Sequence, residues 1–328
     1  MTLHGRSPLP ASTYPCFGTL LTGRFPSRHL VRTTASRPGA IPWWAGQPHV
    51  AAPTLFDVCR GAGLRTAAIQ GDHLLLAVLN ADRATVRWPP GGEVPPHTPV
   101  DAHGYPTNAA VRPHLLDAAA DPGIDFLFGQ LNEGDTLGHD YGPNDPATRA
   151  AHAAADRIVG EVLDALASCW GDTLVVIVSD HGMEPRTGQP PIDLLAAPPV
   201  AAVATDTLAD GGAVLVHLRD GVRDADAGRV LHEVPGVEGW SGAEDGVITA
   251  AARPGWIFSA PRLPARGYHG GPATARTFAA VAGGHPVVPR IARALGRRAP
   301  HLADWAPTIA QVLSLDLPET EGRSLLEN

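Results

Sequence analysis

Residues 173–183, TLVVIVSDHGM, combine a β-branched apolar run with an abrupt change to polar residues. Such a run predicts a buried central strand of a parallel sheet, because an apolar strand of this kind needs cover on both faces. The first polar residues, Ser179, Asp180 and His181, fall at the carboxyl end of that strand. Ligands bind beyond that end in open α/β sheets, so this stretch predicts both a fold class and the place of a site.

The flanking segments alternate between strand and helix patterns. The stretch 146–170 repeats apolar residues along one stripe, from Ile158 to Leu166, which predicts a helix. Further strands are predicted at 64–70, 123–131 and 277–284, and further helices at 54–63 and 301–315. The alternation favours an α/β fold with a mostly parallel sheet. Residues 203–262 show strand, helix and strand patterns and are predicted to form a small α+β cap inserted between the core segments 1–202 and 263–328.

The composition excludes several classes of protein. All 25 basic residues of the 328-residue chain are Arg, so no Lys is available for a Schiff base, a P-loop or a kinase site. A formal net charge of −8 gives no basic footprint for nucleic acid. The densest basic cluster, Arg290, Arg293, Arg297 and Arg298, favours a solvated helix face over a binding patch. Three widely spaced Cys form neither a disulfide framework nor a zinc knuckle.

The expected partner is therefore a small molecule, with neither nucleic acid nor a membrane, and the oligomeric state stays open. No apolar stretch approaches the roughly 18 residues that a membrane span needs. The first residues, MTLHGRSPLP, lack the pattern of a signal peptide. A cytoplasmic location is the default expectation, unless a longer N-terminus carries such a signal.

Three short clusters contain residues of the types that bind metal ions. Asp135 and His139 stand four apart and can face one cation on a helix, although a helix-surface pair has the same spacing. Asp180 and His181 follow an apolar strand as neighbours. They are either metal ligands, or a capping Asp beside a core His. His269 precedes two glycines, where a backbone can approach an ion closely, and a structural His is the alternative. Together they suit two divalent cations with oxygen and nitrogen ligands, most plausibly zinc.

The N-terminal segment adds a likeness to a known family. Residues 12–29, STYPCFGTLLTGRFPSRH, contain Thr-Tyr-Pro, then Leu-Leu-Thr-Gly, then Pro-Ser-Arg-His. DTLGHDYGP (135–143), VIVSDHGM (176–183) and YHGG (268–271) follow in order. These motifs resemble the nucleophile and metal-ligand segments of the type I phosphodiesterase/nucleotide pyrophosphatase family, within the alkaline phosphatase superfamily. The resemblance implies the α/β fold of that superfamily, with helices on both faces of the sheet.

The resemblance also implies roles for individual residues. Thr13 falls on the catalytic threonine of the family, whereas alone it would be read as a turn or N-cap threonine. Two ligand sets are implied: Asp135, His139 and His269 for one zinc ion, and Asp180, His181 and the Thr13 hydroxyl for the other. A metal at that hydroxyl lowers its pKa, so that the alkoxide attacks phosphorus and a phosphothreonine intermediate forms.

One ligand of the family has no counterpart in this sequence. The family carries an Asp at the end of its first strand, a few dozen residues before the nucleophile, whereas none of the twelve residues before Thr13 is Asp or Glu. That first strand is also expected to be missing, which would expose a sheet edge. Three explanations stay open: a longer true N-terminus, a degraded or inactive member, or another group such as Glu133 or a water that completes the second site.

The leading prediction is a metal-dependent hydrolase of phosphodiester or nucleotide pyrophosphate bonds, or of phosphonates, as in the related phosphonoacetate hydrolase. The alternative is a pseudoenzyme that keeps the fold and one metal and binds a ligand or a partner. Substrate contacts are expected in the cap and in residues 80–115, with Trp44 and Tyr105 as candidates. Packing is the alternative role for both of these aromatic residues.

Overall fold

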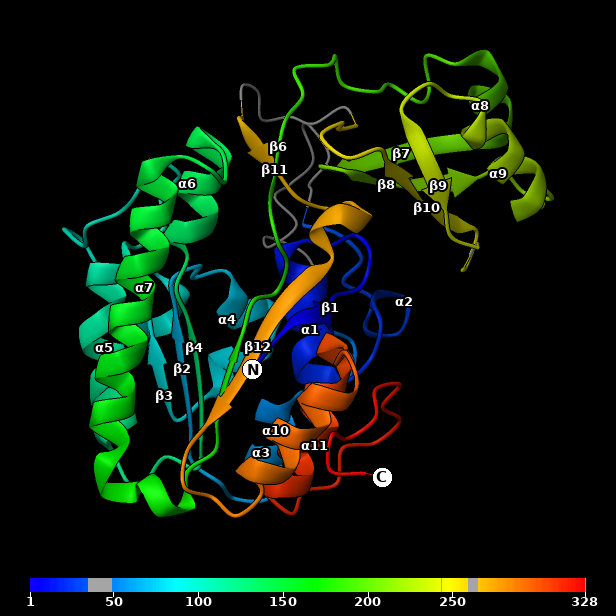
Figure 1. Cartoon of the computed structure of the whole chain (residues 1–328). Coiled ribbons are helices and arrows are strands. Elements are labelled where there is room, and N and C mark those ends of the chain that lie inside the picture. Colours follow the sequence, from blue (N-terminus) through cyan, green and yellow to red (C-terminus); the bar gives the residue numbers. More distant parts are fainter. Residues whose placement is uncertain (35–48, 243, 259–264, 328) are drawn as a thin grey trace.

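The computed structural model describes residues 1–34, 49–242, 244–258 and 265–327. Strands and helices alternate along most of the chain (Figure 1). The strands are β1 (Thr2–Arg6), β2 (Thr66–Gln70), β3 (Val86–Trp88), β4 (Phe126–Gln130), β5 (Val175–Val178), β6 (Glu184–Pro185), β7 (Ala204–Asp210), β8 (Ala213–Leu218), β9 (Val237–Trp240), β10 (Val247–Ala252), β11 (Gly267–Tyr268) and β12 (Arg276–Ala282). The α-helices are α1 (Thr13–Thr22), α2 (Pro26–His29), α3 (Leu55–Gly61), α4 (Leu75–Val78), α5 (Asn108–Ala120), α6 (Glu133–Tyr141), α7 (Pro146–Ala165), α8 (Pro198–Val203), α9 (Asp224–His232), α10 (Val288–Arg297) and α11 (Trp305–Val312).

Two three-stranded sheets form the core of the molecule. In one of them β2 lies between β3 and β4, and all three strands run parallel. In the other β12 lies between β1 and β5 and runs antiparallel to both. The α/β class agrees with the prediction, and the parallel pairing is that of β2, β3 and β4.

Two strands that the sequence predicts to be buried are edge strands instead. β5, at the centre of the run 173–180, pairs only with β12, and all four of its residues are half-buried. β4 pairs only with β2, and only its first residue, Phe126, is buried. Among the strands in the described part of the chain, none lies against the free edge of either, so their side chains keep partial contact with solvent. Apolar composition predicted the burial, and missing edge partners explain why it is incomplete.

Helices cover both faces of the core strands (Figure 1). On one face α5 and α7 enclose a small apolar core with β2 and β3, in which Ile69 and Trp88 are buried. On the other face α1, α3, α10 and α11 enclose the larger core, which contains Leu21, Phe56 and Trp305. This arrangement fits the expectation of helices on both faces.

The region predicted as a cap contains a four-stranded antiparallel sheet in the order β7-β8-β10-β9, with α9 packed on it. Its core is built around Val216, Leu231 and Phe258, and it also takes in Ile192 and Leu194, which precede the predicted boundary. The turn between β7 and β8 contacts the segment around Thr13 through Asp210 and Ser12.

The longest helix, α7, spans 20 residues and buries Thr148, Ala151 and Ile158 along one side. Most of its other residues are half-buried or exposed, which is typical of a helix that covers one face of a sheet. Throughout the described ranges, no helix combines the length and the apolar composition that crossing a bilayer requires.

Candidate metal centre and nucleophile

A carboxylate and two imidazoles converge above the core strands. Helix α6 places Asp135 and His139 one turn apart, with Asp135 Oδ2 3.6 Å from His139 Nε2. His269, which follows β11, brings its Nε2 to 3.8 Å from Asp135 Oδ1. One ligand atom from each of the three residues lies within 4.8 Å of the others. The structure thus brings together the first of the two predicted ligand sets.

Hydrogen bonds to carbonyl oxygens fix the orientation of both imidazoles. His139 Nδ1 donates to Gly267 O at 3.0 Å, and His269 Nδ1 donates to Ala11 O at 3.1 Å. Since each Nδ1 carries the proton, each Nε2 keeps a lone pair that faces Asp135. Asp135 Oδ1 is buried and has no hydrogen-bond partner in the described structure. A carboxylate with one orphaned oxygen beside two such nitrogens fits a cation better than it fits a structural cluster.

The second predicted set lies directly beside the first. His181 Nε2 is 3.4 Å from Thr13 Oγ1 and 3.3 Å from Asp180 Oδ2. Its ring stacks on that of His269, with 3.9 Å between the ring centroids. His181 Nδ1 donates to Gly182 O at 3.0 Å, which again leaves Nε2 for the site. The strand end that the sequence singled out therefore reaches both Thr13 and the first predicted ligand set.

Burial and neighbouring charges set the protonation of the two stacked imidazoles. Burial lowers the pKa of His269 well below its ordinary value, and the nearby His181 and His139 add to this effect. Burial also acts to lower the pKa of His181, but the carboxylates of Asp180 and Asp135 outweigh it and raise the pKa overall. His269 is therefore held neutral, which is the form that binds a metal ion.

Thr13 is the first residue of α1, and Ser12 is the N-cap. The family likeness placed a nucleophile here, while residue patterns alone suggested a turn or an N-cap. The Thr13 side chain does not cap the helix but turns toward His181. The positive end of the helix dipole at such a position favours an anionic phosphoryl group.

Asp210 is a buried carboxylate beside the Thr13 segment, and the sequence analysis did not identify it. Its Oδ2 accepts hydrogen bonds from Ser12 Oγ and Thr33 Oγ1, each at 2.7 Å, and from Thr34 N at 2.9 Å. Thr34 Oγ1 in turn accepts from Tyr14 N at 3.2 Å, so the network holds the residues on both sides of Thr13. The Asp-Gly-Gly sequence at 210–212 signals a tight turn, but no local pattern indicates what the carboxylate contacts.

The β7–β8 turn also contacts the loop that carries His269. Gly212 N donates to His269 O at 2.8 Å. A Cβ on Gly211 would lie 2.1 Å from the same carbonyl oxygen, so no other residue fits here without a shift. Gly211 also has a positive φ of 60°, which glycine adopts without strain. One turn of the predicted cap therefore contacts both the residue before Thr13 and the predicted ligand His269.

Of the two predicted substrate-contacting residues, one lies near the site and the other falls outside the described residues. Tyr105 is hydrogen-bonded to Tyr14, the residue after Thr13. Tyr14 is also hydrogen-bonded to the buried Asp72 at the end of β2, and burial raises the pKa of that carboxyl to about 7. Trp44 belongs to the range 35–48.

Glu133 was suggested from the sequence as a substitute ligand. Its Oε2 accepts a hydrogen bond from Asn108 N at 3.0 Å, which joins the first residue of α6 to the first residue of α5. It is not part of the three-residue ligand group described above.

Comparison with protein families finds one match that covers most of the chain. The family described as type I phosphodiesterase / nucleotide pyrophosphatase matches residues 3–255. That range contains the segments of Thr13, Asp135 and Asp180 but stops before His269.

Curated relatives match shorter stretches. Bis(5'-adenosyl)-triphosphatase ENPP4 from Bos taurus is 32% identical over 114 residues, which cover 32% of this chain and 25% of the relative. Venom phosphodiesterase 2 from Crotalus adamanteus is 29% identical over 206 residues, covering 55% and 22% respectively. The chain thus spans a quarter of the length of these relatives, or less.

Solved structures show the same fold. Murine ectonucleotide pyrophosphatase / phosphodiesterase 5, an inactive variant in complex with AMP, superposes with a TM-score of 0.69 at 17% identity, over 97% of this chain and 88% of that one. Phosphonoacetate hydrolase from Sinorhizobium meliloti 1021, in complex with phosphonoacetate, gives a TM-score of 0.59 at 19% identity, over 84% and 80%. The predicted fold class is confirmed by these likenesses.

Proposed function

Because the chain belongs to the type I phosphodiesterase/nucleotide pyrophosphatase family, we propose that it hydrolyses phosphodiester or nucleotide pyrophosphate bonds, or related phosphonates, in small molecules. The observation that carries this proposal is convergence: Thr13 lies within 3.4 Å of His181, whose ring stacks on His269, a member of the three-residue ligand group. The complexes of the similar structures with AMP and phosphonoacetate support the substrate class.

We propose that the site binds two divalent cations, and that these are zinc, because imidazole and carboxylate together suit it. Asp135, His139 and His269 would hold one ion, and Asp180 and His181 with the Thr13 hydroxyl would hold the other. When bound, such ions supply Lewis-acid charge that lowers the pKa of a hydroxyl and stabilises a leaving oxygen. The buried Asp135 oxygen without a hydrogen-bond partner supports the first of the two positions.

The reaction then proceeds through two successive displacements at phosphorus. The Thr13 Oγ bond to phosphorus forms as the bond from phosphorus to the leaving oxygen breaks, which leaves a phosphothreonine. A water oxygen then bonds to phosphorus, the bond to Oγ breaks, and the hydroxyl is restored. Asp210 keeps Ser12 in place throughout, so the reacting oxygen stays aimed at the ligand groups.

Turnover of a chromogenic phosphodiester by zinc-loaded protein tests the proposal. Thr13→Ala is expected to lower kcat by roughly 10³-fold or more, because no other group in the segment replaces the nucleophile. Thr13→Ser keeps a hydroxyl and is expected to retain part of the activity. Thr205→Ala, which alters an exposed threonine on β7, is the matched control and should turn over like the parent. Equal rates for the parent and Thr13→Ala would overturn the catalytic role.

A second candidate is a ligand-binding protein without turnover. It is favoured by one observation: among the described residues only Asp135, His139 and His269 form a three-residue ligand group, whereas Asp180 and His181 form a pair beside Thr13. Tight binding of a phosphoester by a parent protein that shows no turnover would support this candidate over the first.

A further inference from the structure

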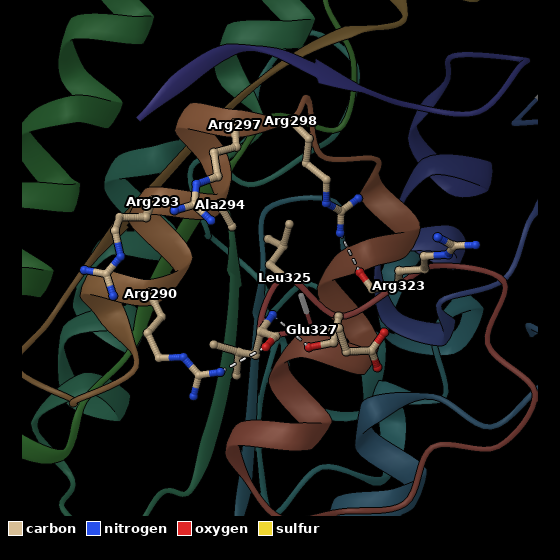
Figure 2. A pocket seen from close by; sticks show the side chains of 10 residues that line it. Arg290, Arg293, Ala294, Arg297, Arg298, Arg323, Leu325 and Glu327 are labelled. Carbon is tan, nitrogen blue, oxygen red and sulfur yellow. Dashed lines mark hydrogen bonds between the residues drawn. The ribbon is translucent and has the colours of Figure 1, made fainter.

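The arginines that line a hollow between α10 and the C-terminal segment do not converge on one point (Figure 2). Arg290 Nη2 donates to Leu326 O at 3.0 Å, and Arg298 Nη2 donates to Arg323 O at 2.9 Å. The side chains of Arg293 and Arg323 point away from the hollow on opposite sides. These positive charges therefore fasten the C-terminal segment or face solvent. A connected group of polar side chains lies instead beside the proposed metal centre.

The loop 99–107, which precedes α5, is held in a closed shape by one carboxylate. Asp101 N donates to Tyr105 O at 2.8 Å. Asp101 Oδ1 accepts from the backbone N–H groups of His103 at 2.9 Å and of Tyr105 at 3.0 Å. The turn thus occupies one oxygen of this carboxylate and leaves the other, Oδ2, for a partner outside the loop.

On one side the loop contacts helix α6, which carries two of the predicted ligands. The buried Thr136 donates from its Oγ1 to Asp101 Oδ2 at 2.9 Å. His103 Nε2 lies 2.9 Å from Asp140 Oδ1. Each of the two contacted residues of α6 directly follows one of these ligands in the sequence. The loop therefore supports the helix at the two places where the ligand side chains leave it.

On the other side the loop contacts the segment of the proposed nucleophile. Tyr105 is hydrogen-bonded to Tyr14, which directly follows Thr13. Tyr14 is also hydrogen-bonded to Asp72, just beyond the end of β2. Tyr14 and Asp72 are only 2% and 3% exposed, so each depends on such bonds to offset the cost of burying a polar group. The loop therefore reaches Thr13 through a single intervening residue.

A second set of bonds, at the carboxyl ends of β2 and β4, closes a ring. Asp72 N donates to Gln130 Oε1 at 2.8 Å, and Gln130 Nε2 donates to Asn132 Oδ1 at 2.9 Å. Asn132 Nδ2 then donates to Thr136 Oγ1 at 3.1 Å. With the contacts of the loop, these bonds form one hydrogen-bond ring that starts and ends at Asp101.

The hydrogen-bond ring favours one arrangement of its members, because a buried polar group is left without a partner wherever a bond breaks. It joins the residue after Thr13 to the residue after Asp135, so it sets the spacing of these two residues. Stabilisation of the loop alone would need only the bonds within 99–107. The bond from Thr136 crosses to the ligand helix instead.

We propose that Asp101 is a positioning residue of the proposed catalytic site. It acts on Asp135 through Thr136, and on Thr13 through the two tyrosines of the ring. Groups behind metal ligands orient them, and a misplacement of about 1 Å can cost roughly 100-fold in rate. The proposal rests on the proposed metal centre and function, and Asp101 is not itself one of the proposed ligands.

Zinc affinity, measured by competition with a chelator, tests this role without requiring turnover. Asp101→Asn keeps one acceptor oxygen where two are used, and Thr136→Val keeps the shape of the side chain but neither of its bonds. Each variant is expected to weaken zinc binding roughly tenfold. Each should also lower kcat on a chromogenic phosphodiester by a similar factor, with a smaller effect on KM. Thr136→Ser keeps the hydroxyl and should recover most of both losses.

The double variant Asp101→Asn/Thr136→Val should bind zinc no more weakly than the weaker single variant, because both changes remove the same contact. Asp82→Asn and Thr205→Val change exposed residues elsewhere and are the matched controls, which should bind zinc like the parent. The proposal is wrong if both single variants bind zinc as the parent does and only unfold more easily, or if their effects add in the double variant. A parent that binds zinc but does not hydrolyse the ester would overturn the proposed function, and the zinc affinities would still decide the role of Asp101.

Discussion

Asp210 shows how a single side chain links distant parts of the chain. It is 198 residues from Ser12 in sequence, yet its carboxylate accepts the Ser12 hydroxyl at 2.7 Å. It also accepts from Thr33 and Thr34, so one buried charge organises three donors around the N-terminus of α1. Hydrogen bonds to a buried charge are stronger than those between neutral groups, which makes this carboxylate a positioning residue for Thr13.

Asp210→Ala is expected to lower kcat on a chromogenic phosphodiester by roughly 10- to 100-fold with a smaller effect on KM, because the nucleophile loses its support but not its hydroxyl. It should also reduce the free energy of unfolding by about 2–3 kcal/mol, since the Ser12, Thr33 and Thr34 donors lose a charged acceptor. Steady-state kinetics and urea unfolding measure the two effects. Asp220→Ala, at an exposed turn next to β8, is the control and should change neither. A parent-like kcat in Asp210→Ala would contradict the positioning role.

His29 makes the stability of the fold depend on pH. It is fully buried, its Nδ1 accepts from Val31 N at 3.2 Å, and its Nε2 lies 3.1 Å from Thr19 Oγ1. Burial lowers its pKa from 6.5 to about 4, so the folded protein keeps the ring neutral where the unfolded chain would protonate it. The stability that this provides is complete above pH 6.5 and is lost as the pH falls toward 4, by about 3 kcal/mol in all.

Urea unfolding at pH 7 and at pH 4.5 checks this expectation. In His29→Gln, which cannot titrate, the loss of stability between the two pH values should be smaller than in the parent. His49→Gln removes an exposed histidine and serves as the control. An identical pH dependence in the parent and His29→Gln would show that His29 is not the group responsible.

The strands of the core differ in how well their edges are covered. β2 is paired on both sides and all five of its residues are buried. β4 and β5 are each paired on one side only within the described structure, and apart from Phe126 their residues are half-buried or exposed. Every second N–H of such a strand points away from its only partner, so the two strands should open locally more easily than β2.

Hydrogen exchange of the zinc-loaded protein tests this difference. Amides of β2 are expected to exchange at least about 100-fold more slowly than the amides on the free edges of β4 and β5. The amides by which β5 pairs with β12 serve as the internal control and should be protected. Uniform protection across all three strands would mean that the free edges are covered in solution.

Four segments that are far apart in the sequence meet at the proposed metal centre. Metal binding and folding of the whole molecule are therefore expected to be coupled. Elemental mass spectrometry on protein purified without chelator should find close to two zinc ions per chain. His269→Ala should lose one of them, while His232→Ala, at an exposed position on α9, should lose none. Removal of the metal should also lower the unfolding temperature, because the ions bind only the folded state. One zinc ion per chain in the parent would mean that the second ligand set is incomplete.

Much of the architecture follows from local patterns. The strands at 64–70 and 123–131 and the helix at 146–170 lie where the apolar periodicity predicted them, with shorter bounds in the structure. The local pattern did not determine how deeply β5 is buried, because whether an apolar strand is central depends on neighbours from elsewhere in the chain. Helix α5, which begins at Asn108, was not predicted from the sequence.

The proposed ligands show the same difference between what local sequence and what tertiary structure determines. Residue identity and spacing alone singled out Asp135, His139, Asp180, His181 and His269, since carboxylates and imidazoles at strand ends and one helical turn apart are recognisable in any chain. Their convergence, the distance from Thr13 to His181 and the support from Asp210 came only from the tertiary structure. The physical reason is that chemical type and local periodicity are properties of neighbouring residues, whereas contacts between remote segments depend on how every element packs.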